Sequence, residues 1–157
     1  MKSTELDALY RKVLLDHYRD PRCRDPISSP THRQKASNPL CGDETSLAVE
    51  LVDGRFLKIQ VRSGGCSICV ASGSMMGEIV QGRTEKETRR IADAFQLLMK
   101  GSPIPDNVDL GDLRVLEGVL RFPERVKCAT LPWVALEGIL LERERELEGD
   151  QKKDREK

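Results

Sequence analysis

Three cysteines that lie far apart in the sequence each stand beside residues that shape the backbone. They occur in Asn38-Pro39-Leu40-Cys41-Gly42-Asp43, in Gly64-Gly65-Cys66 and in Lys127-Cys128-Ala129-Thr130. The proline and glycine that flank Cys41 predict a tight, exposed loop. Gly64-Gly65 predicts the end of a strand, so Cys66 would begin a helix, where the positive end of the helix dipole favours a thiolate. We therefore predict that the three thiols and Asp43 assemble into one site.

Three thiolates and one carboxylate form a donor set that suits tetrahedral Zn²⁺, and the excess of sulfur also suits an iron–sulfur cluster. Closed structural zinc sites more usually have a fourth Cys or a His, so Asp43 predicts a weaker ligand at which the site can open. Cys69 follows Cys66 on the same helical face and could replace Asp43, or form a redox dithiol with Cys66. The alternative for any one of these thiols is a small buried apolar side chain.

Composition excludes several classes of function. The chain has 157 residues with 26 basic and 26 acidic side chains, so no global field attracts it to nucleic acid or membranes. Aromatic residues make up only 4%, which argues against a platform for stacking bases. No apolar run approaches the roughly 20 residues that span a bilayer, and the N-terminus has no apolar signal core. We expect a single cytoplasmic domain whose five cysteines serve metal binding or reactivity rather than disulfides.

Hydrophobic periodicity predicts a mixture of helices and strands. Residues 45–52 alternate as a strand, Asp53-Gly54 is a hairpin turn, and residues 56–61 return beside the first strand. This hairpin would bring Cys41 and Cys66 to the same end of the sheet. The first helix is predicted to end at Asp20-Pro21.

The rest of the chain is predicted to be loops and helices. The proline-rich stretch 20–40 is predicted to be a loop in which Cys23 and His32 have no function and His32 is solvated. Further helices are predicted at 66–82, from Thr84 to about Lys100, within 101–127, and from about Thr130, with Pro132 in the first turn of the last. Residues 142–157 are predicted to be a solvated helix end that frays into a charged tail.

These motifs together resemble the U-type iron–sulfur cluster assembly family, which includes the IscU and SufU proteins and the N-terminal domain of NifU. The resemblance spans residues 9 to about 140. Besides the two cysteine segments at 38–43 and 127–131, it rests on Leu9-Tyr10-Arg11, Leu15-Asp16-His17-Tyr18-Arg19-Asp20-Pro21-Arg22, Gly65-Cys66-Ser67-Ile68 and Ala71-Ser72-Gly73-Ser74-Met75-Met76.

Two features resemble the SufU-like, zinc-dependent branch of this family. Lys127 precedes the third cysteine, where the IscU branch typically has His, and residues 101–127 resemble the helical insertion of SufU-like proteins. The resemblance implies an α+β fold of the SufE/NifU-like type, with a small antiparallel sheet of about three strands packed against several helices. It further implies one domain over residues 1–141 and zinc bound by Cys41, Asp43, Cys66 and Cys128. One departure is Cys69, which stands where Ser is expected.

The resemblance also implies a function in iron–sulfur cluster assembly. Cys41 would accept a persulfide sulfur from a pyridoxal-phosphate cysteine desulfurase of the SufS type, and downstream assembly proteins would receive it. The chain would then be a sulfur carrier that acts with the desulfurase rather than an independent enzyme. The alternatives are a scaffold for a [2Fe–2S] cluster on Cys41, Cys66, Cys128 and Asp43, and a zinc-stapled interaction module without chemistry.

Overall fold

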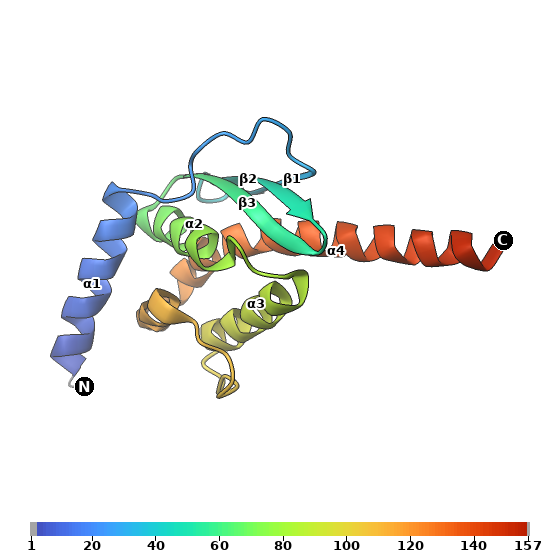
Figure 1. The fold of residues 1–157 in the computed structure, drawn as a ribbon. Helices are drawn as coiled ribbons and strands as arrows, with labels where there is room; N and C mark the ends of the chain where they lie inside the picture. Colours follow the sequence, from blue (N-terminus) through green and yellow to red (C-terminus); the bar gives the residue numbers. More distant parts are fainter. Residues whose placement is uncertain (1–2, 157) are drawn as a thin grey trace.

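The computed structural model describes residues 3–156 and has an α+β architecture (Figure 1). Its elements are, in chain order, α1 (Ser3–Arg19), β1 (His32–Asn38), β2 (Asp43–Val52), β3 (Arg55–Gly64), α2 (Ser67–Val80), α3 (Glu85–Met99), the 3₁₀ helices η1 (Gly111–Arg121) and η2 (Pro123–Arg125), and α4 (Val126–Glu156). The predicted fold class, a small antiparallel sheet packed against several helices, is confirmed. No helix in this part of the chain is both long and apolar enough to cross a membrane.

The three strands form one antiparallel sheet in the order β1-β2-β3. Asp53 and Gly54 link β2 to β3 with φ angles of 52° and 76°. A two-residue turn with both φ angles positive has a twist compatible with that of the flanking strands, so the predicted hairpin turn is confirmed. At the other end of β2, Asn38 pairs with Asp43, and residues 39–42 close the turn from β1. The next pair in register, Glu44 with Gly64, places the end of β3 beside this turn.

Strand β1 corrects the prediction of a continuous loop over residues 20–40. Its sequence, His-Arg-Gln-Lys-Ala-Ser-Asn, lacks the apolar alternation that identifies a strand, because polar side chains occupy both faces. Backbone pairing with β2 forms the strand instead, and its inner face contacts α4 through polar groups: the Gln34 amide donates to Glu142 at 3.3 Å. The strand is therefore a product of tertiary context.

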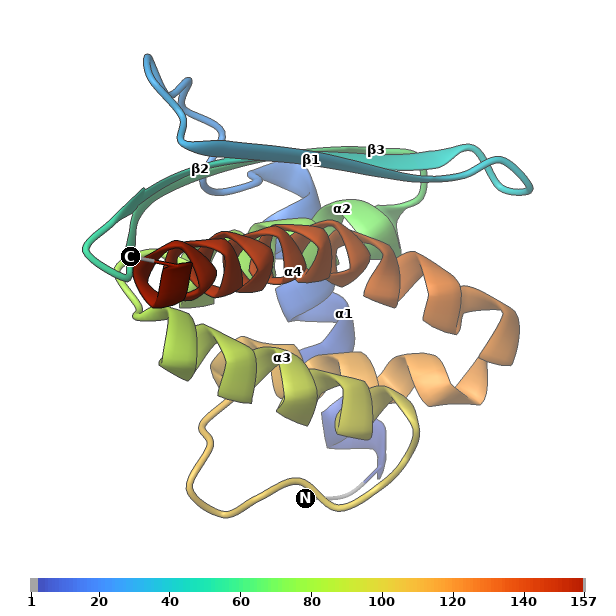
Figure 2. The same ribbon diagram turned by 90° about the vertical axis from the view of Figure 1, so that its right-hand side faces the viewer.

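All of the helices lie on one side of the sheet, and its other face is free of helices (Figure 2). Helices α2 and α4 pack directly against the inner face, and α3 and η1 lie beyond them. The core consists of apolar side chains from every layer, among them Leu47, Val49, Phe56, Ile59, Val61, Met76, Val80, Phe95, Leu116, Leu136 and Ile139. Met75 and Met76 of α2 are buried and belong to this core.

Small residues in α2 let it approach β3 closely. A Cβ atom at Gly73 would lie 2.5 Å from Ser63 Oγ and 3.1 Å from Val61 Cγ1. Helix α3 begins as predicted: the Thr84 hydroxyl caps it by accepting from the Glu87 amide at 3.1 Å.

The C-terminal region differs from the prediction in three ways. The helix expected within 101–127 is the 3₁₀ helix η1, and α4 begins at Val126 rather than at Thr130. Pro132 consequently lies inside α4, where it offers no N–H to the Cys128 carbonyl four residues earlier. The solvated helix end predicted after residue 141 is present, with residues 144–150 exposed, but α4 continues to Glu156 without the predicted fraying. Ion pairs from α3 hold part of this extension, including Arg89 to Glu144 and Glu85 to Arg143, both at 2.7 Å.

Candidate metal centre

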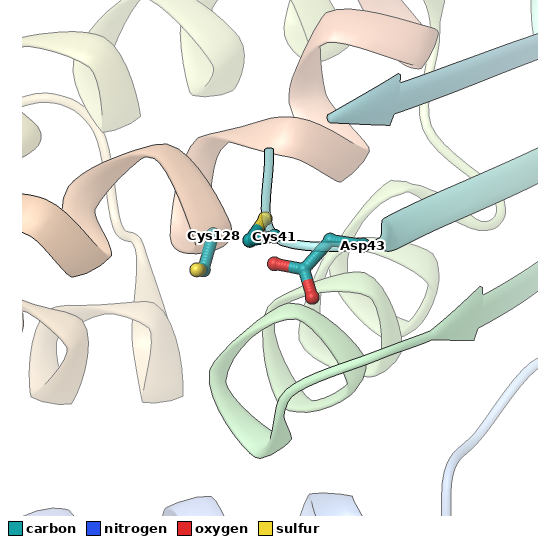
Figure 3. Close-up of side chains that lie close together, drawn as sticks. All are labelled: Cys41, Asp43 and Cys128. Carbon is teal, nitrogen blue, oxygen red and sulfur yellow. The ribbon is translucent and has the colours of Figure 1, made fainter. Parts of the chain in front are cut away.

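The four predicted site residues come from three separate segments that meet at one end of the sheet. Cys41 lies in the turn from β1 to β2, Asp43 begins β2, Cys66 caps the N-terminus of α2, and Cys128 lies in the first turn of α4. One donor atom each from Cys41, Asp43 and Cys128 lies within 4.8 Å of the other two (Figure 3). Cys66 meets this group through Asp43, since its Sγ lies 3.6 Å from Asp43 Oδ2.

The turn that carries Cys41 is organised by Asn38. The Asn38 carbonyl accepts from the amides of Cys41 at 3.3 Å and Gly42 at 2.9 Å, and its side chain accepts from the Leu40 amide at 3.1 Å. Gly42 has a φ of 76°, a conformation that glycine adopts at no steric cost. Cys41 is exposed, as predicted, and the neighbouring Leu40 side chain is 92% exposed. The turn therefore presents one thiol and one apolar side chain to anything that approaches the site.

Asp43 is buried at the centre of the site, with only 1% of its surface exposed. Its Oδ1 accepts from the Cys66 amide at 2.9 Å. Burial works against ionisation, but hydrogen bonds from the Cys128 thiol, the Cys66 amide and the Cys41 thiol outweigh it and lower the pKa of Asp43. The carboxylate is thus ionised at neutral pH.

The absence of a side chain at Gly65 leaves room for the Asp43 carboxylate. Gly65 has a φ of 116°, and a Cβ atom on it would overlap Asp43 Oδ1 and lie 2.9 Å from the Asp43 Cα. The sequence identifies Gly64-Gly65 only as the end of a strand; it does not show that Gly65 leaves room for the carboxylate.

Two helix N-termini point their positive ends toward the thiols. Cys66 is the N-cap of α2, which confirms its predicted position at a helix start, and Cys128 lies in the first turn of α4. A helix N-terminus stabilises negative charge, and thiolates are the metal-binding form of cysteine. Burial and the hydrogen bond to Asp43 raise the pKa of the Cys128 thiol above its ordinary range. Metal binding at this cysteine would therefore release a proton.

Cys69 lies one helical turn farther into α2 and is fully buried. Its Sγ lies 3.7 Å from Thr45 Oγ1, and burial, partly offset by this contact, raises the pKa of its thiol to about 11. The group of mutually close donors that contains Cys41 and Cys128 includes Asp43 but neither Cys69 nor Cys66, and Cys66 Sγ contacts Asp43 Oδ2 directly at 3.6 Å. This geometry favours Asp43 over Cys69 as the fourth member of the set.

Ser72 anchors the start of α4, and with it Cys128. Its hydroxyl donates to the Ala129 carbonyl at 2.5 Å and accepts from the Trp133 indole N–H at 3.2 Å. All three residues are buried. The sequence does not reveal this contact, because a serine within a helix gives no sign of its partner on another helix.

His32 corrects the prediction of a solvated loop histidine. It is buried in β1, with Nε2 2.8 Å from Glu146 Oε1 and Nδ1 2.9 Å from Thr31 Oγ1. These contacts join β1 to α4, away from the thiols. Cys23 lies in the loop after α1, as predicted, and its carbonyl accepts from the Val61 amide at 2.7 Å.

Comparison with known proteins gives a consistent assignment. Residues 9–129 match the family model of the NifU-like N-terminal domain. The chain belongs to this family. Among its relatives, a zinc-dependent sulfurtransferase SufU of Bacillus subtilis (strain 168) is 40% identical over 136 residues, covering 86% of this chain and 91% of the relative.

Two further comparisons agree. An iron–sulfur cluster assembly scaffold protein IscU of Streptococcus pyogenes serotype M1 is 35% identical over 136 residues, covering 87% of this chain and 85% of the relative. The crystal structure of a putative iron–sulfur cluster assembly scaffold protein for the SUF system, from Fervidobacterium islandicum AW-1, superposes with a TM-score of 0.76 at 28% identity. That match covers 83% of this chain and 95% of the other. The predicted family resemblance is confirmed.

Proposed function

We propose that Cys41, Asp43, Cys66 and Cys128 bind zinc, and that the chain accepts and carries sulfur for iron–sulfur cluster assembly. The observation that carries the metal proposal is Asp43, a buried and ionised carboxylate that forms no ion pair with a basic side chain in the described residues. Hydrogen bonds from the Cys66 amide and the neighbouring thiols stabilise this buried charge, and a bound cation would stabilise it more strongly than the thiol protons do. Three thiols around that carboxylate complete a donor set typical of Zn²⁺.

The names of the relatives support the sulfur-carrier role. The Bacillus subtilis relative is named a zinc-dependent sulfurtransferase, and this chain covers most of its length. We propose that a cysteine desulfurase is the sulfur donor and that downstream iron–sulfur assembly proteins are the recipients. All five cysteines are free, which agrees with the reducing cytoplasm as the setting.

Cys41 is the sulfur acceptor in this proposal because it is the exposed cysteine among the four site residues. Its thiolate attacks the outer sulfur of a persulfide on the donor cysteine. A new S–S bond forms between Cys41 Sγ and that sulfur, while the S–S bond to the donor breaks and the donor leaves as a thiolate. The transfer is an exchange between sulfurs and needs no external oxidant or reductant. Bound zinc would supply a positive charge that keeps the site thiols deprotonated.

The chain's own residues position this exchange. Asn38 holds the Cys41 turn at the surface, and Leu40 offers apolar surface beside the thiol. Asp43 and Cys128 are buried, so the donor persulfide is expected to meet Cys41 first.

A second candidate function is a scaffold for a [2Fe–2S] cluster on the same ligands. The clustering of three thiols with one carboxylate favours it, because thiolates are the usual ligands of such clusters. The Streptococcus pyogenes relative carries the name of a scaffold protein.

One experiment separates these functions. The protein is purified aerobically, its zinc content is measured, and it is incubated with a cysteine desulfurase and cysteine before peptide mass spectrometry. A carrier gains the mass of one sulfur atom on Cys41, and Cys41→Ser abolishes the gain. Cys23→Ser is the matched control, since Cys23 lies outside the metal group, and it should accept sulfur as the parent does.

Other outcomes contradict the carrier role. Undiminished sulfur transfer to Cys41→Ser would remove Cys41 from the role of acceptor. Stable visible absorbance after reconstitution with iron and sulfide, without transfer to Cys41, would favour the scaffold. Stoichiometric zinc with neither signal would leave an interaction module stabilised by zinc.

A further inference from the structure

A hollow of about 640 Å³ lies between the end of α1, the loop that follows it, and β3. Every charged side chain that lines it is an arginine: Arg19, Arg22, Arg24 and Arg62. No acidic side chain of the described residues contributes to its wall. Such a concentration of one sign of charge stands out in a chain whose net charge is zero.

Three of these arginines have no acidic partner. Arg22 pairs with Asp16 at 2.6 Å and with Glu78 at 3.6 Å, so its charge is balanced within the fold. Arg19, Arg24 and Arg62 form no ion pair with any carboxylate of the described residues. Like charges held around one hollow repel one another, and an incoming anion relieves that repulsion.

A second hollow, of about 830 Å³, continues the first across the outer face of the sheet. Arg62 lines both hollows, and the second adds Arg33 and Lys35, again without any acidic side chain in its wall. Lys35 and Arg62 pair with the same β2 residue, Ser46, from opposite sides, so they lie in one row across the sheet.

We call this surface, made of Arg19, Arg24, Arg62, Lys35 and Arg33, the basic strip. Arg33, Lys35 and Arg62 are exposed. They lie on the strands of the sheet, whose outer face carries no helix in residues 3–156 (Figure 2). All five side chains of the basic strip are exposed, and the loop residues Pro26 and Ile27 border it where they line the second hollow.

We propose that the basic strip binds an extended, carboxylate-rich segment of a protein partner. The guanidinium group is planar and matches the two oxygens of a carboxylate. Two strand spacings separate Lys35 from Arg62, about 10 Å, and side chains on one side of an extended peptide recur about every 7 Å. The length of the strip thus suits a chain of carboxylates better than a single small anion.

The position of the strip explains what such binding would do. The first hollow is also lined by Ser63 and Val70. The Val70 amide donates to the Cys66 carbonyl at 3.2 Å, so the hollow lies one helical turn from the metal centre. A partner held at the strip would be brought beside that centre. The binding itself requires neither zinc nor sulfur transfer, so the inference stands independently of the proposed function.

The test uses a short fluorescent peptide in which Glu alternates with Ser, titrated with the full chain and followed by anisotropy. Binding should weaken with added salt, and the same peptide with Gln in place of Glu should not bind. The variant Arg24→Gln/Arg62→Gln should bind about tenfold more weakly, since each exposed ion pair contributes about threefold. Both side chains are exposed and unpaired in the described structure, so the variant should keep its melting temperature and its zinc.

The matched control is Arg90→Gln/Arg114→Gln, which removes the same charge from exposed positions on α3 and η1. It should bind the peptide as the parent does. Equal weakening in both variants would show a net-charge effect and overturn the proposal, as would no binding of the Glu peptide. The bound peptide is also challenged with pyrophosphate and with a single-stranded oligonucleotide. If either displaces it at a lower concentration than unlabelled peptide does, the strip binds a phosphate ligand and the proposal is overturned.

Discussion

Gly65→Ala should damage the proposed metal centre, although Gly65 itself provides none of the proposed ligand atoms. Gly65 adopts a φ of 116°, and a methyl group there would overlap Asp43 Oδ1 and approach the Asp43 Cα to 2.9 Å. Because part of the contact is with backbone, rotation of the Asp43 side chain alone cannot relieve it. The carboxylate must leave its position, and its 2.9 Å hydrogen bond from the Cys66 amide would be lost.

Two costs add in this variant. An L-residue with positive φ costs about 1–2 kcal/mol relative to glycine, and overpacking adds about 1–3 kcal/mol. A melting temperature about 4–20 °C lower follows, at about 2–4 °C per kcal/mol for a chain of this size. Displacing a group that orients a metal site typically lowers metal affinity about ten- to a hundredfold.

Gly82→Ala provides the matched control. Gly82 has a φ of 88°, but a Cβ atom there would meet nothing within 4 Å, so this variant tests backbone strain alone. Thermal unfolding gives the stability of both variants, and competition with a chelator gives their zinc affinity. Gly82→Ala should lose only the smaller increment of stability and keep its zinc affinity. If the two variants behave alike in both assays, the contact between Gly65 and Asp43 does not position the carboxylate.

Two further predictions concern the support of the site. Ser72→Ala should destabilise the protein by about 1–3 kcal/mol in urea unfolding, because the buried Trp133 indole N–H loses its acceptor. A change under about 0.5 kcal/mol would show that the Trp133–Ser72 hydrogen bond does not contribute to stability. Burial raises the pKa of the Cys69 thiol from 9.0 to about 11, so this thiol ionises less readily in the folded than in the unfolded state. The free energy of unfolding should therefore fall as the pH rises from about 9 to 11. The loss should reach about 2–3 kcal/mol relative to Cys69→Ala, and parallel stability curves for the two proteins over that range would refute it.

Much of the fold could be predicted because the relevant signals are local. Asp53-Gly54 specifies its hairpin, Thr84 caps α3, and Gly64-Gly65 ends β3 so that Cys66 begins α2. These predictions depend on backbone conformations that only a few residue types favour. The convergence of Cys41 with Cys66 followed from the same hairpin.

The errors have non-local causes. Strand β1 has no apolar face of its own, so its formation depends on β2 and α4. Proline is common in the first turn of a helix, so Pro132 predicts a later start for α4 than the structure shows, where η2 leads directly into the helix. The sequence does not reveal the burial of His32, because its partner, Glu146, lies in another element far along the chain.

The distribution of the donor atoms over three elements has a consequence for stability. The β1–β2 turn with the start of β2, the N-cap of α2 and the first turn of α4 have no covalent bridge between them, since every cysteine is free. Whatever binds there ties these segments together and stabilises the folded state by mass action, in proportion to the logarithm of its concentration over its dissociation constant. Resistance of the turn at residues 39–42 to proteolysis would then report how much of the protein is loaded.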